Sequence, residues 1–178
     1  IQQALAATHL LTDAIRRDLF GEPEPAVPGQ PAQWQAGRYR PEQTAKVYER
    51  MWELAAAALA RGAPVILDGT FLENEHRLAA ANVAQEAGVP CLIVETTCSE
   101  ATALRRIAAR QASGTALSEA DTAIYRAQRE RYAQDLPIVP AGTAKVEIST
   151  ERDGLIWIGP VLRALTDSGT LQTVSWHD

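Results

Sequence analysis

The stretch from Pro64 to Phe71 constrains the fold more than any other part of the sequence. Its letters are PVILDGTF, a short apolar run that ends in a carboxylate, a glycine and a hydroxyl. Helix-like sequence precedes and follows it, so the run predicts a strand buried on both faces, as in a parallel sheet. Open α/β sheets bind ligands at the carboxyl ends of their strands, and Asp68 falls at such an end. The alternative is that Asp68 is a turn residue that caps the next helix.

Strand-like and helix-like segments alternate along most of the chain. We expect strands at residues 8–12, 65–67, 91–95 and 144–148. We expect helices at residues 14–20, 41–62, 74–87, 99–113, 118–132 and 156–165. This order predicts an α/β fold in three layers (α/β/α), with a parallel sheet covered by helices on both faces. The interpretation gives one domain over residues 1–165, with a proline-rich loop near residues 22–37, and a C-terminal tail over residues 166–178.

Composition and charge narrow the class of protein. The chain has 178 residues, enough for one domain, and 46% of them are hydrophobic, as in globular proteins. No apolar run approaches the roughly 20 residues of a membrane span, so we expect no membrane partner. Cys91 and Cys98 lack metal-ligand spacing, which favours free thiols and a cytoplasmic location. The net charge of -5 favours a small molecule or nucleotide over a long nucleic acid as the partner. Nothing indicates an oligomeric state.

Asp13 and Arg16 form the first candidate constellation. Asp13 follows the first expected strand, so a parallel sheet would bring it to the same edge as Asp68. Arg16 comes three residues later and would share that side of a helical turn. Such a carboxylate can accept a proton from a hydroxyl while the guanidinium holds an anionic or polar substrate. The alternative is a capping aspartate beside a solvated arginine.

Arg106 and Arg110 form the second candidate constellation. They are four residues apart on an expected helix, which places them about 6 Å apart along one face. A segment of small residues, 111–117, follows them. This combination suits an anionic phosphate group over which a lid closes. A solvated basic helix face is the alternative.

The order and spacing of these segments resemble the P-loop kinases of the polynucleotide-kinase, gluconate-kinase and zeta-toxin type, often classed as AAA-family ATPases. The resemblance runs from about His9 to Ile148 and covers most of the chain. Its motifs are a Ser-Asp-x-x-Arg-like strand end, a Tyr-x-Pro-Glu helix start, a VILDATF-like strand with an arginine after it, and a pair of lid arginines. In this sequence they are Thr12 to Arg17, Tyr39 to Glu42, Val65 to Phe71 with Arg77, and Arg106 with Arg110.

The resemblance implies an ATP-dependent phosphotransferase that acts on a hydroxyl group with Mg²⁺. It implies that Asp13 is the general base and that Arg16 orients the substrate. It implies that Asp68 is the Walker-B-like acid, which acts on Mg²⁺ through water or positions the acceptor, without a direct metal ligand. Thr70 and Arg77 would line the same crevice and bind substrate. Arg106 and Arg110 would neutralise charge on the transferring phosphoryl group, in keeping with catalysis by positioning and electrostatics.

One departure from the family is large. The family places a strand and a Gly-x-x-x-x-Gly-Lys-[Ser/Thr] loop before these motifs, and no such loop occurs in the 178 residues. We expect it directly upstream of Ile1, with residues 1–7 as the end of its helix. That loop supplies the backbone N–H groups and the lysine that hold phosphates. Binding of ATP and Mg²⁺ is therefore conditional on an upstream loop, and so is enzymatic activity.

Three interpretations stay open. The first is a kinase domain that acts on a small molecule or nucleotide and is a piece of a longer ATP-binding protein. The second is a noncatalytic, degenerate P-loop-fold module for interaction or regulation. The third is a polynucleotide 5′-hydroxyl kinase. The acceptor pocket would be built from residues 22–39 and the Asp13 region, where kinases of one fold differ from one another.

Overall fold

The computed structural model describes residues 6–21, 37–113, 122–134, 136–151 and 158–167. Its strands are β1 (Thr8–Leu11), β2 (Val65–Asp68), β3 (Cys91–Thr97) and β4 (Thr143–Ser149). Its helices are α2 (Thr12–Phe20), a short 3-10 helix η1 (Gly37–Tyr39), α3 (Pro41–Ala60), α4 (Asn74–Glu86), α5 (Glu100–Ser113), α6 (Thr122–Gln134) and α7 (Ile158–Asp167). Strands and helices alternate as the sequence predicts, and the expected boundaries that fall on described residues agree with these to within a few residues. The expected helix starts at residues 118 and 156 lie outside the described residues.

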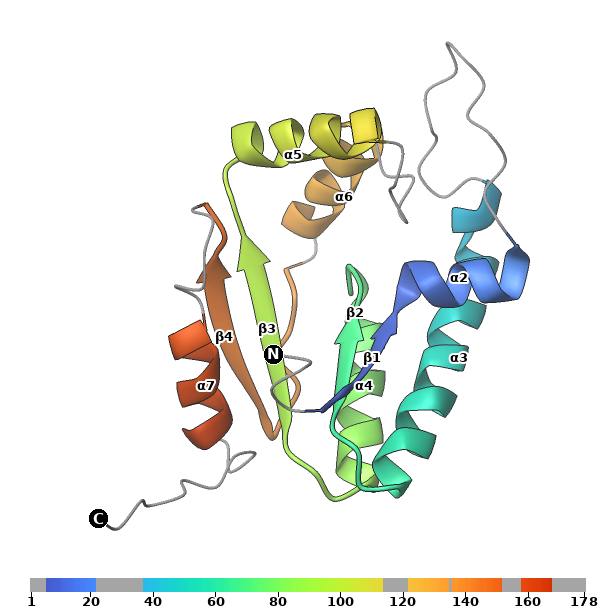
Figure 1. The fold of residues 1–178 in the computed structure, drawn as a ribbon, viewed down its shortest axis with the longest axis vertical. Coiled ribbons are helices and arrows are strands. Elements are labelled where there is room, and N and C mark those ends of the chain that lie inside the picture. Colours follow the sequence, from blue (N-terminus) through green and yellow to red (C-terminus); the bar gives the residue numbers. More distant parts are fainter. Residues whose placement is uncertain (1–5, 22–36, 114–121, 135, 152–157, 168–178) are drawn as a thin grey trace.

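The strands are parallel, but they form two pairs rather than the single sheet that we expected. β1 pairs with β2, with Leu11 opposite Asp68, and β3 pairs with β4, with Thr97 opposite Ser149. Within the described residues no ladder joins β2 to β3. Strands share a ladder only when they lie about 4.8 Å apart, and no described strand bridges the two pairs. All four strands still run toward one end of the molecule, where α2, α5 and α6 lie (Figure 1).

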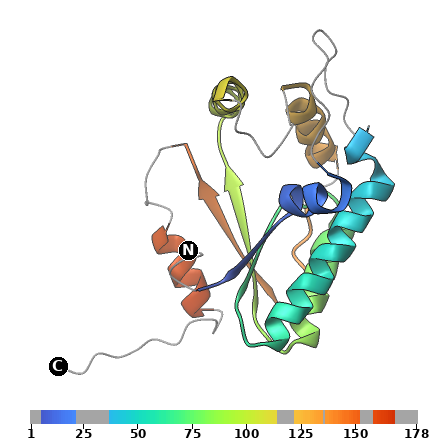
Figure 2. The same cartoon turned by 45° about the vertical axis from the view of Figure 1, so that its right-hand side comes forward.

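Helices cover the strands on two sides. In Figure 2 the strands lie between α7 and the pair α3 and α4. α3 packs against β1 and β2, whereas α7 packs against β3 and β4. The described residues therefore form an α/β fold with parallel strands, in two strand pairs that helices pack against.

The core centres on α3. Pro41 occupies its first turn, where a proline costs no hydrogen bond. The residues of α3 that are almost inaccessible to solvent recur every three to four positions, as in a helix with one buried face: Val47, Met51, Ala55 and Ala58. The helical spacing of Ala45, Tyr48, Trp52, Ala55 and Leu59 also predicts one buried face, and of these Tyr48 and Ala55 are buried. Ala45 is exposed because α3 turns Val47 and Met51 toward the core.

Several expectations fall on parts of the chain that the structure does not describe. They are the helix end before Ala6, the loop over residues 22–36, the start of the helix at Ser118, and the tail beyond Asp167. Among the described residues, no helix is both long and apolar enough to cross a membrane.

Candidate functional site

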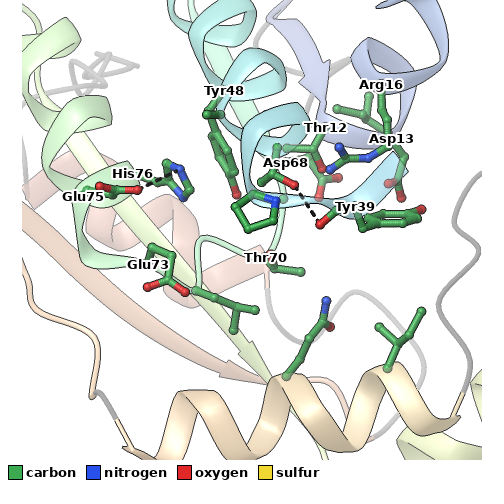
Figure 3. Close-up of a pocket in the computed structure, with 18 of the residues that line it drawn as sticks. Thr12, Asp13, Arg16, Tyr39, Tyr48, Asp68, Thr70, Glu73, Glu75 and His76 are labelled. Atoms are coloured by element: carbon green, nitrogen blue, oxygen red, sulfur yellow. Dashed lines mark hydrogen bonds and ion pairs between the residues drawn. The ribbon is translucent and has the colours of Figure 1, made fainter. Parts of the chain in front are cut away.

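A cavity of about 640 Å³ lies at the carboxyl ends of β1 and β2 (Figure 3). Its walls come from the start of α2, the start of α3, the turn after β2, the end of α5, and α6. Five of the seven predicted site residues line it: Asp13, Arg16, Asp68, Thr70 and Arg110. The structure therefore brings together both acidic residues and one arginine from each predicted constellation.

The two carboxylates reach the cavity because β1 and β2 are parallel neighbours. Leu11 and Asp68 are partners in the ladder, and α2 begins directly after Leu11 without a loop. Asp13 consequently sits in the first turn of α2, where the helix dipole favours a negative charge. Figure 3 shows Asp13 and Asp68 approaching the same space from these two elements.

Gly69 sets the distance between these two elements. A Cβ at this position would lie 2.7 Å from Cγ2 of Thr12, far closer than carbon atoms pack. The turn after Asp68 can lie against the start of α2 only because residue 69 has no side chain. Gly69 therefore allows Asp68 and Asp13 to share one cavity.

The next residues of this turn are held in a strained conformation. Phe71 has a φ of 44°, which is unusual for a residue other than glycine. Its N–H donates to the Tyr48 hydroxyl at 3.1 Å, and its carbonyl accepts from Nε of Arg77 at 2.7 Å. Two side chains from α3 and α4 thus hold the turn that carries Thr70, and residues in such conformations cluster at functional sites.

Arg77 is a correction to the sequence analysis. It is only 7% exposed, it is occupied by the Phe71 carbonyl, and it does not line the cavity. Burial lowers the pKa of Arg77, and the nearby Glu95 opposes that shift. Arg77 supports the turn from behind instead of facing the crevice.

Arg16 is a buried cation that lines the cavity. It is 5% exposed, and its guanidinium carbon lies 4.5 Å from the centre of the Tyr39 ring. A cation over an aromatic face is stabilised by about 1–2 kcal/mol when it is shielded from water. Arg16 therefore presents a fixed positive charge to the cavity from α2, the helix that also carries Asp13.

Arg106 and Arg110 point to different places, although they are four residues apart on α5. Arg106 donates from Nη1 to Oγ1 of Thr150 at 3.1 Å and from Nη2 to its carbonyl at 2.6 Å. It fastens α5 to the residue after β4 and does not line the cavity, contrary to the expectation of a paired role. Arg110, one turn later, does line it.

The start of α5 carries a polar network that the sequence analysis missed in part. Ser99 accepts a hydrogen bond from the N–H of Thr102 at 3.2 Å and so caps the helix. Ser99 and Thr102 also donate to the carboxylate of Glu151, at 2.8 Å and 2.6 Å from their hydroxyls. The Thr102 hydroxyl, followed by the backbone N–H and hydroxyl of Ser99, lowers the pKa of Glu151 to about 2.

Aromatic and acidic residues complete the cavity wall, and the sequence analysis had given them no role in the site. Tyr48 stacks on His76, with ring centres 3.7 Å apart, and both line the cavity. Burial raises the pKa of Tyr48 and lowers that of His76, which favours the neutral form of each. Glu73 also lines it, and Nε2 of His9 lies 3.2 Å from Oδ2 of Asp68. In the sequence, the only indication that Glu73 and His76 belong to the site is that they follow closely after Phe71.

The described residues thus form a parallel α/β fold with acidic and cationic side chains at the carboxyl ends of its strands, where open α/β sheets bind ligands. The family model described as an AAA domain matches residues 1–134 of the 178, well over half of the chain. The chain therefore belongs to the AAA-domain family of P-loop proteins, a family of nucleotide-binding domains.

Comparison with solved structures supports the same fold. The chain is similar to a crystal structure described as "a putative kinase" from Chloroflexus aurantiacus J-10-fl. The TM-score is 0.65 and the identity 18%, and the match covers 96% of this chain and 88% of that one. At this identity the likeness establishes the fold alone. No match was found among curated proteins.

Proposed function

We propose that this protein is an ATP-dependent phosphotransferase domain that transfers a phosphoryl group to a hydroxyl of a small molecule or nucleotide. One observation carries the proposal: two carboxylates and two guanidinium groups line the same cavity at the carboxyl ends of parallel strands. These residues are Asp13, Asp68, Arg16 and Arg110. Phosphoryl transfer needs this combination of a proton acceptor and fixed positive charge.

Each residue takes a role that fits its place. Asp13 accepts the proton of the acceptor hydroxyl, and the buried Arg16 orients the acceptor beside it. Thr70 offers a hydroxyl to the substrate from the turn after β2. Arg110 lines the cavity from α5 and neutralises charge on the phosphoryl group in transit.

The carboxylates also fit Mg²⁺, which prefers oxygen ligands and keeps several of its waters. Within the described residues, no group of three or more acidic, histidine or cysteine side chains could hold a metal ion by itself. Asp68 would therefore hold Mg²⁺ through water, with ATP supplying further oxygens, and the ion would neutralise phosphate charge. These 178 residues contain no Gly-x-x-x-x-Gly-Lys-[Ser/Thr], so the proposed activity depends on a phosphate-binding loop that this sequence does not supply.

The test is Asp13→Asn in the full-length protein. Loss of the general base should lower turnover by about 10²- to 10⁴-fold. The affinity for Mg-ATP, measured by calorimetry, should stay the same. The matched control is Asp18→Asn, because Asp18 is exposed on the same helix and does not line the cavity. Unchanged turnover in Asp13→Asn would refute the assignment.

The missing loop supports a second candidate, a noncatalytic module for interaction or regulation. The coding sequence upstream of Ile1 separates the two, because a phosphate-binding loop there favours the kinase. For the acceptor, Glu75 adds negative charge to the cavity beside Asp13 and Asp68, which disfavours a polyanion. Small alcohols, nucleosides and a 5′-hydroxyl oligonucleotide, offered in competition, would separate the acceptor classes.

A further inference from the structure

Helices α5 and α6 form a cap over the candidate site. α5 contributes Arg110 to the cavity wall, and α6 contributes Ile124 and Gln128. In Figure 1 these two helices lie beyond the carboxyl ends of the strands, apart from α3 and α7. The position of the cap therefore decides whether Arg110 faces the two carboxylates.

α6 is held at its C-terminal end by a two-point ion pair. Nη2 of Arg131 lies 2.6 Å from Oε2 of Glu73, and its Nε lies 3.3 Å from Oε1. This is the bidentate geometry in which a guanidinium matches a carboxylate in both direction and distance. The side chains are 28% and 34% exposed, so they are shielded from much of the solvent that weakens surface pairs.

A neighbouring bond ties the same two parts together. Asn74, directly after Glu73, accepts a hydrogen bond from the backbone N–H of Ile138 at 2.9 Å. The chain leaving α6 is therefore attached to the start of α4 at two adjacent residues. Both residues follow the turn that carries Asp68 and Thr70.

The other end of the cap is attached to the other strand pair. Arg106 and the Glu151 network join the start of α5 to the residues after β4. The cap thus spans from the β3–β4 pair to the β1–β2 side, and no ladder joins those pairs within the described residues. Loss of either attachment would let Arg110 move relative to Asp13 and Asp68.

We propose that Glu73 and Arg131 are positioning residues, whose ion pair holds α6 and the cap in place over the cavity. They act through Arg110 and Gln128. The proposal that this pair aids catalysis rests on the proposed phosphotransferase function, whereas the proposal that it fixes the cap does not.

Amide hydrogen exchange on the full chain tests the structural part directly. We expect exchange of the α6 amides to become about ten-fold faster in Arg131→Gln and in Glu73→Gln. In the double variant it should be no faster than in either single one, because the two changes remove the same interaction. Exchange of the α3 amides should not change. Arg131→Lys keeps the positive charge but cannot make both parallel hydrogen bonds. Its α6 exchange rate should lie between those of the parent protein and Arg131→Gln.

The matched control is Arg50→Gln, which removes an ion pair of similar length, 2.7 Å to Glu53, within α3 alone. It should leave exchange in α6 unaltered. The proposal is overturned if the single variants leave α6 exchange unchanged, if their effects add in full, or if Arg50→Gln loosens α6 as much.

Activity forms a separate arm, measured in the protein with its phosphate-binding loop. Arg131→Gln should lower kcat about five- to ten-fold and leave the KM for ATP nearly unchanged, because Arg131 does not line the cavity. If the parent protein transfers no phosphoryl group, the proposed function fails while the exchange data still decide the role of the pair. If the parent is active and Arg131→Gln keeps full kcat despite a loosened cap, the positioning role is refuted.

Discussion

The carboxyl ends of the two strand pairs carry similar side chains and use them differently. Beyond β1 and β2, Asp13 and Asp68 line a cavity, and the Asp68 side chain is 59% exposed. Beyond β3 and β4, Glu151 is bound by Ser99 and Thr102, and the Thr150 carbonyl is bound by Arg106. Polar residues at a strand end therefore do not define a site by themselves. What distinguishes the β1–β2 end is that its charged groups face a space large enough for a ligand.

Helix α5 contains the same contrast within four residues. Arg106 belongs to the bound network and Arg110 to the cavity, although the sequence pattern made them a pair. Residues that line the cavity should therefore affect turnover, and residues of the bound network should affect stability.

The largest effect is expected for Arg110. Arg110→Gln in the protein with its phosphate-binding loop should lower turnover about 100-fold or more, because an arginine on the transferring phosphoryl group typically contributes 10³- to 10⁵-fold. Arg106→Gln should lower turnover less than ten-fold and lower the thermal midpoint. Turnover and thermal unfolding of the two variants, measured side by side, decide the matter. Equal losses of turnover would show that the contrast within α5 is mistaken.

Two glycine substitutions, one near each strand pair, compare the two ends of the molecule by their effect on stability. Gly69→Ala should destabilise the protein by about 1–3 kcal/mol, because the new Cβ meets Thr12 beside the cavity. Gly159→Ala, in α7 on the β3–β4 side, meets nothing within 4 Å. It should destabilise the protein less than Gly69→Ala does, because the added Cβ crowds its chain neighbour Pro160 and not another element. Denaturant unfolding measures both, and a Gly69→Ala protein as stable as the parent would contradict the close approach.

Much of the fold and the centre of the site were predictable because they depend on local patterns. Alternating apolar runs and helical periodicity place the strands and helices, and parallel neighbouring strands bring Asp13 near Asp68. The split of the sheet was not predictable, because strand pairing depends on segments far apart in the sequence. The same holds for the hydrogen bonds to Glu151, whose partners Ser99 and Thr102 lie 52 and 49 residues away.

Two of the predicted arginines, Arg77 and Arg106, lie outside the cavity for a related reason. Sequence shows where a guanidinium stands on a helix but not which carbonyl lies within its reach. Arg77 is occupied by the Phe71 carbonyl and Arg106 by that of Thr150, and neither acceptor is marked by its residue type. Arg16 on α2 and Arg110 on α5 do line the cavity.

The smallest effect concerns pH and belongs to the β3–β4 end. Hydrogen bonds from Thr102 and Ser99 lower the pKa of Glu151 from its ordinary value of 4.5 to about 2. A carboxylate with a lowered pKa in the folded state stabilises the protein above its unfolded pKa, and this contribution disappears as protons bind. The stabilisation should be complete above about pH 4.5 and should be lost as the pH falls through about 2.

Thermal midpoints of the parent protein and Glu151→Gln, measured from pH 7 down to pH 2, should therefore converge in acid. The variant should be less stable at neutral pH, and the gap should close between about pH 4.5 and 2. Other carboxylates titrate in this range in both proteins, so the difference between the two curves isolates residue 151. A gap of the same size at pH 7 and pH 2 would mean that Glu151 does not serve as the bound anion at the start of α5.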